Sequence, residues 1–118
     1  MAKSWDLRAI ETAGGSRSPI VLHSEEEGRA VLIGLEPGQE LGDHQVKEHA
    51  FLVVVEGRAR IDSGGDSIDA GIGTLVLLEP NERRSVSSPD GARVLLLFAP
   101  WPGEGHYHAE ERAARKRG

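Results

Sequence analysis

Short apolar runs rich in Val, Leu and Ile recur along this chain, and turns containing Gly or Pro separate them roughly every ten residues. This spacing is typical of an all-β sandwich or barrel built from about eight or nine short strands. No stretch before residue 100 sustains a helical period. At 118 residues the chain has room for one domain with its own hydrophobic core. We therefore predict a single all-β domain.

The expected strands include residues 20–22, 29–35, 51–55, 58–62, 67–69, 74–78, 84–88 and 93–99. The runs 51–55 and 74–78 are apolar at both alternating sets of positions, which predicts that both of their faces are buried. Gly57 separates run 51–55 from run 58–62. We predict that these two strands form a hairpin.

The ends of the chain differ in composition from its middle. The flexible break Ala13-Gly14-Gly15-Ser16 predicts an N-terminal arm over residues 1–18, followed by the barrel over residues 19–100. Residues 101–118 are expected to form a C-terminal tail. Its His106-Tyr107-His108 segment has the spacing of a ligand pair, but it follows a turn-rich stretch, and surface histidines are the favoured interpretation.

Charge and composition exclude several classes of protein. Fourteen basic against nineteen acidic residues leave a net charge of -5, which argues against a nucleic-acid partner. The absence of cysteine excludes disulfides and thiolate sites. No apolar run is long enough for a membrane span, and the N-terminus lacks an apolar signal core. These features predict a cytoplasmic protein without a membrane partner.

Residues 37–57 resemble the first motif of the cupin superfamily, which runs glycine, five residues, His-x-His, three or four residues, glutamate, six residues and glycine. Here Gly38 is followed after five residues by His44, and Gly57 closes the segment at the family spacing. Residues 73–88 have the length of the second cupin motif. The resemblance covers residues 29–99 and implies a cupin-type double-stranded β-helix, or jelly-roll barrel.

The resemblance also implies that the usual metal site is lost. In cupins that bind metal, two histidines and a glutamate of the first motif and one histidine of the second hold the ion. His44 matches the first ligand, but Val46 replaces the second histidine, Ala50 (or Phe51, if the spacing is one longer) replaces the glutamate, and Arg84 replaces the last histidine. Valine and alanine cannot donate to a divalent ion, and arginine would repel it. We therefore expect no cofactor.

Strand alternation identifies the residues that would face the barrel interior, since residues two apart share a face. The expected ligand-binding set is His44, Val46, Glu48, Ala50, Leu52, Val54 and Arg84. An inward Arg84 requires a partner, either Glu48 or the carboxylate of a ligand, unless it turns outward to solvent.

The leading functional hypothesis is a metal-free small cupin that binds a small, anionic organic molecule as a binding or sensing module. A cofactor-independent isomerase or epimerase, with His44 as the base and Arg84 holding an oxyanion, is one alternative. Another is a metal-dependent cupin enzyme with displaced ligands, for which His44 and Glu48 supply only two donors. Phe51, Val53 and Val55 form an outer apolar row, which predicts a homodimer.

Overall fold

The computed structural model describes residues 2–44 and 47–100, without the side chains of Arg17, Asp43 and His44. Within these ranges the chain forms one short 3-10 helix and nine strands. They are η1 (Gly15–Arg17), β1 (Ile20–Glu25), β2 (Gly28–Leu35), β3 (Gln39–His44), β4 (His49–Gly57), β5 (Ala59–Ser63), β6 (Asp66–Ala70), β7 (Leu75–Leu78), β8 (Arg84–Ser88) and β9 (Ala92–Ala99).

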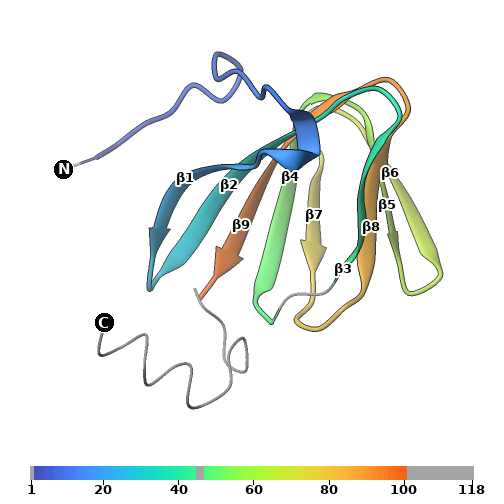
Figure 1. Cartoon of the computed structure of the whole chain (residues 1–118). Helices are drawn as coiled ribbons and strands as arrows, with labels where there is room; N and C mark the ends of the chain where they lie inside the picture. The colour runs from blue at the N-terminus through green and yellow to red at the C-terminus, as the bar shows by residue number, and fades with distance from the viewer. Residues whose placement is uncertain (1, 45–46, 101–118) are drawn as a thin grey trace.

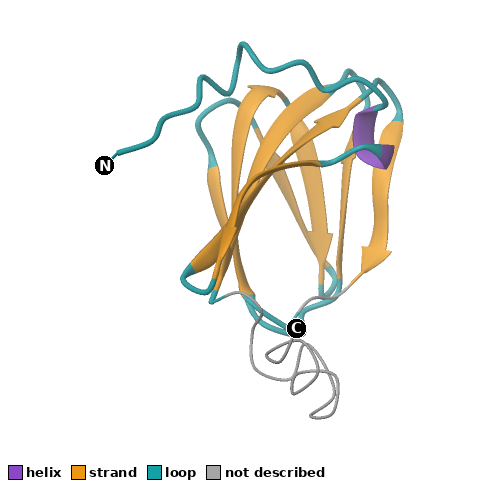
Figure 2. Ribbon diagram, turned by 60° about the vertical axis from the view of Figure 1, so that its left-hand side comes forward, coloured by secondary structure: helices purple, strands orange, loops and turns teal. Residues whose placement is uncertain are grey.

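The strands form two antiparallel sheets that face one another (Figures 1 and 2). One sheet has five strands in the order β1-β2-β9-β4-β7, and the other has four in the order β3-β8-β5-β6. Consecutive strands repeatedly lie in different sheets, as in a double-stranded β-helix. The all-β prediction is confirmed.

The predicted hairpin between residues 51–55 and 58–62 is wrong. β4 pairs with β7 and β9, whereas β5 pairs with β6 and β8 in the other sheet. The chain passes from one sheet to the other at Gly57, whose φ of 75° is left-handed. A Cβ there would overlap the carbonyl oxygen of Gly91. The glycine therefore marks a close backbone crossing, and the hairpin forms one strand later, between β5 and β6 at Gly64-Gly65.

A continuous hydrophobic core fills the space between the sheets. Alternate residues of β2, β4, β5, β7 and β9 contribute to it, as the strand period requires, together with single residues of β6 and β8. The core residues are Val31, Ile33, Leu35, Ala50, Leu52, Val54, Ala59, Ile61, Ala70, Val76, Leu78, Val86, Val94, Leu96 and Phe98.

Burial of both faces of β4 and β7 was predicted, and this is also wrong. Leu75 and Leu77 on the outer face of β7 are 61% and 53% exposed, and Phe51 beside them on β4 is 36% exposed. β7 is an edge strand of its sheet. Apolar residues on both faces of these strands therefore signal an uncovered outer surface rather than a buried one.

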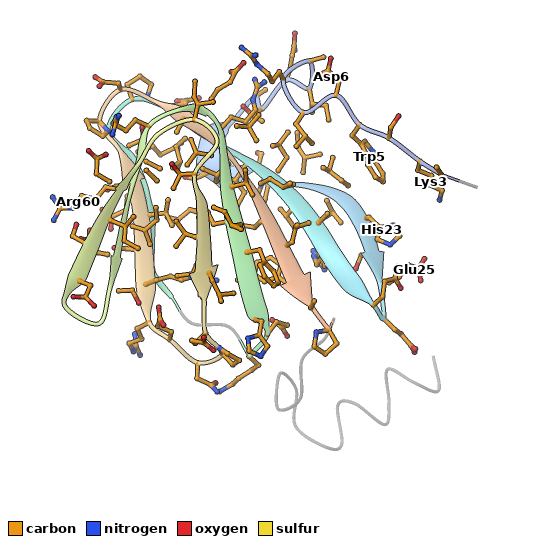
Figure 3. All side chains as sticks on the ribbon, turned by 180° about the vertical axis from the view of Figure 1, so that it is seen from behind. Lys3, Trp5, Asp6, His23, Glu25 and Arg60 are labelled. Atoms are coloured by element: carbon orange, nitrogen blue, oxygen red, sulfur yellow. The ribbon has the colours of Figure 1, made fainter. Side chains whose placement is uncertain are left out.

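The N-terminal arm covers the other end of that outer face, over β2. One Arg93 nitrogen, Nη1, donates to the backbone carbonyls of Leu7 and Arg8 at 3.2 and 2.7 Å. Leu32 lies on the outer face of β2, opposite the core residues Val31 and Ile33, and it is fully buried there. Lys3 and Trp5 lie near His23 of β1 (Figure 3), where they line a hollow with Ala30.

Within the described ranges, no helix is long and apolar enough to cross a bilayer.

Candidate functional site

One row of residues crosses the four-stranded sheet near the end of β8. Arg84 pairs with His44 of β3 on one side and with Ser63 of β5 on the other, and Ser63 pairs with Asp66 of β6. Because directly paired residues of an antiparallel sheet share a face, the side chains of Arg84, Ser63 and Asp66 lie on one face of this sheet. Val86 and Ser88 lie two and four residues after Arg84 and therefore share its face of β8. Both are buried, which identifies this face as the inner one.

Arg84 lies inside the molecule rather than at its surface. Its side chain is 2% exposed and is among the largest fully buried side chains of the described residues. Neither of its terminal nitrogens, Nη1 and Nη2, has a hydrogen-bond partner among those residues. Burial lowers the pKa of this guanidinium, and the negative charges of Glu82 and Glu48 oppose that effect. Arginine nevertheless keeps its charge inside proteins, so a buried cation faces the interior.

Two acidic side chains act on this cation from different segments. Glu48, directly before β4, is 1% exposed. Glu82 lies in the connection between β7 and β8 and accepts a hydrogen bond from the Ser63 hydroxyl. Ser63 therefore holds the Glu82 carboxylate on the Arg84 side of the sheet.

A hollow of about 230 Å³ lies between the β5–β6 hairpin and β7. Its apolar part includes Ile61, Val76 and Leu78, which are core residues. Ser63, Asp66 and Glu82 also line it. This hollow connects the surface with the residues next to Arg84.

The alternation predicted for the first motif holds wherever side chains are described. Glu48, Ala50, Leu52 and Val54 are all buried, and the last three belong to the hydrophobic core. The backbone of His44 pairs with Arg84, but its side chain lies outside the described part of the chain. Val46 and the His106-Tyr107-His108 segment also lie outside it.

Ser63, Asp66 and Glu82 were not among the residues predicted for the site. Ser63 and Asp66 approach Arg84 because β5 pairs with both β8 and β6, whereas Glu82 lies two residues before Arg84 in the sequence. The incorrect β4–β5 hairpin concealed this neighbourhood. Ser63 could have been found from the inward alternation of Ala59 and Ile61, which it continues.

The side chains described at the positions that resemble cupin metal ligands do not fit a divalent metal. Ala50 is a core residue without a donor atom, and Arg84 places a cation beside the backbone of His44. Within residues 2–44 and 47–100, no group of three or more His, Asp or Glu side chains could hold a metal ion.

No family model matches the sequence, and no curated protein sequence matches it. Solved structures do match. An RmlC-like cupin from Desulfovibrio desulfuricans has a TM-score of 0.73 at 24% identity, covering 85% of this chain and 98% of that one. An RmlC-like cupin from Shewanella frigidimarina has a TM-score of 0.71 at 21% identity, covering 85% and 91%.

A third match is an RmlC-like cupin family protein with a double-stranded β-helix fold from Methanocaldococcus jannaschii. Its TM-score is 0.67 at 18% identity, covering 78% of this chain and 89% of that one. These likenesses agree with the spacing of Gly38, His44 and Gly57 and with the crossing of strands between two sheets. The chain has the fold of the cupin superfamily, a double-stranded β-helix.

Proposed function

We propose that this chain is a metal-free binding or sensing module that holds a small organic anion on Arg84 inside its barrel. The observation that carries the proposal is the burial of the Arg84 guanidinium, whose two terminal nitrogens have no hydrogen-bond partner among the described residues. Burying a cation is costly unless it is paired and hydrogen-bonded. A carboxylate supplies both the charge and the two acceptor atoms.

The geometry of the guanidinium favours a carboxylate. Two parallel N–H donors of an arginine match the two oxygens of a carboxylate, and such bidentate pairs are among the strongest hydrogen-bonded contacts in proteins. Glu48 and Glu82 influence Arg84 electrostatically, but neither accepts a hydrogen bond from its terminal nitrogens. The donors are therefore available to a ligand, and the apolar core beside them suits an apolar ligand body.

The test compares the wild type with the Arg84→Met variant in thermal-shift titrations against a panel of small organic acids. Methionine is apolar and lacks the charge and donors, so anion binding is expected to weaken by about 1–3 kcal/mol. Arg83→Met is the matched control, because Arg83 is exposed. If no acid stabilises the wild type, or if Arg84→Met responds like the wild type, the proposal is wrong.

A further inference from the structure

Among the described residues, those around Arg84 carry more negative than positive charge. Among the described residues Arg84 is the only buried cation, whereas Glu48 is a buried acid. Glu82 and Asp66 add two carboxylates on the wall of the adjoining hollow. Arg83 follows Glu82 in sequence, but it is exposed, and solvent and salt screen its charge.

Ser63 contacts both Glu82 and the backbone of Arg83 through its hydroxyl. Ser63 lies directly opposite Arg84 in the β5–β8 pairing, and its hydroxyl donates to a Glu82 carboxylate oxygen. Ser63, the cross-strand neighbour of Arg84, thus hydrogen-bonds the Glu82 carboxylate, and the negative charge of Glu82 acts on Arg84. A second negative charge on a ligand would meet this anchored carboxylate.

We propose that Glu82, positioned by Ser63, makes this site selective for monocarboxylates over dianions such as dicarboxylates and phosphate. The inference rests on the proposed function, because it concerns the ligand that Arg84 holds. One ligand carboxylate takes both terminal nitrogens of Arg84, which have no hydrogen-bond partner among the described residues. A further negative charge has no buried cation to pair with in the described chain, and like charges placed together disfavour the wrong ligand.

Coulomb's law sets the size of the effect to expect. Repulsion by Glu82 grows in proportion to ligand charge, so its removal should benefit a dianion about twice as much, in free energy, as a monoanion. If Glu82→Gln strengthens butyrate binding about threefold, succinate and phosphate binding should strengthen about tenfold. Glutamine keeps an oxygen that can accept from Ser63.

The experiment is calorimetric titration of the full chain with butyrate, succinate and inorganic phosphate at matched ionic strength. The pH is chosen so that succinate and phosphate are dianionic. The variants are Glu82→Gln, Ser63→Ala and Ser63→Thr, with Glu26→Gln as the matched control. Glu26 is an exposed acid in the turn between β1 and β2. β1 is an edge strand of the five-stranded sheet, whereas Arg84 lies in the four-stranded sheet.

We expect wild type to prefer butyrate over both dianions, and Glu82→Gln to reduce that preference. Ser63→Ala should reduce it in part, Ser63→Thr should restore it by returning the hydroxyl, and Glu26→Gln should leave it unchanged. Equal or tighter binding of the dianions by wild type would overturn the proposed selectivity but not the proposed function. A folded Glu82→Gln variant that keeps the full preference for butyrate would have the same consequence. Failure of all three anions to bind wild type would instead overturn the proposed function.

Discussion

At the scale of single residues, the buried charge of Arg84 is expected to lower the stability of the folded protein. Within the described part of the chain, the terminal nitrogens of this buried cation make no hydrogen bond, which is costly to the folded protein. Replacing it by methionine is therefore expected to raise the free energy of unfolding by about 1–2 kcal/mol in the absence of ligand. Urea denaturation measures this change. The exposed Arg83→Met control should shift stability by less than about 0.5 kcal/mol. A large loss of stability in Arg84→Met would show that the guanidinium makes net favourable contacts.

A second residue-scale prediction concerns metal content. Ala50 offers no donor and Arg84 carries a positive charge at two of the positions that resemble cupin ligands. We expect the purified protein to contain no stoichiometric transition metal, which elemental analysis by mass spectrometry would check. Close to one nickel, iron, manganese or zinc ion per chain, lost on mutation of His44, would contradict this expectation.

At the scale of elements, the crossing between β4 and β5 depends on Gly57. Its φ is left-handed, and the close approach of the Gly91 carbonyl leaves no space for a side chain. Gly57→Ala should lower the free energy of unfolding by at least about 2 kcal/mol. The control is Gly42→Ala, where a Cβ would meet nothing within 4 Å. Equal urea midpoints for the two variants would show that the crossing relaxes easily.

The N-terminal arm is a separate element whose attachment depends on Arg93. This side chain donates to two arm carbonyls and lies 3.6 Å from Glu56, which also contacts Arg8. Arg93→Met removes these bonds and should cost about 1–3 kcal/mol of stability. Trypsin cleavage after Arg8 should then become faster, as mass spectrometry of the products would show.

The control for the arm is Arg60→Met. Arg60 points away from the sheets (Figure 3), and its ion pair with Asp62 is exposed. Such pairs contribute little, so this variant should be cleaved after Arg8 at the wild-type rate. An Arg93→Met variant with the same cleavage rate would show that other contacts hold the arm.

At the scale of the whole molecule, the outer face of the five-stranded sheet is covered at one end only. The arm packs over β2, whereas Phe51 pairs with Leu77 and Leu97 in an exposed apolar row across β7, β4 and β9. A second copy with the same flat row offers a self-complementary surface about a two-fold axis. The homodimer predicted from Phe51, Val53 and Val55 stays a prediction, now with Leu77 in the row.

Light scattering after size exclusion tests this assembly. Wild type should show twice the 12.7 kDa chain mass, and Leu77→Lys should shift the protein toward monomer by placing like charges near the axis. Ile68→Lys is the control, since Ile68 is an exposed apolar residue of the other sheet. A monomeric mass for wild type across the micromolar range would contradict the prediction.

Local patterns in the sequence were enough to predict where most strands lie and which residues of the first motif point inward. Side chains of a strand alternate between its faces, and Gly or Pro turns end each run, so neighbouring residues alone carry this information. The inward set Glu48, Ala50, Leu52 and Val54 followed from this alternation. The cupin-type fold was implied by the resemblance of the Gly38, His44 and Gly57 spacing to the first cupin motif.

The pairing of the strands, by contrast, emerged only from the packed chain. Ser63 reaches Arg84 because β5 leaves β4 at Gly57 and pairs with β8, a contact between segments distant in sequence. The same pairing brings the Ser63 hydroxyl to the Glu82 carboxylate. Alternation reports the face of a residue but not the neighbouring strand, and it cannot tell a covered outer face from an open one. The placement of Ser63 beside Arg84 and the exposed row at Leu77 are both consequences of long-range packing, which no local pattern encodes.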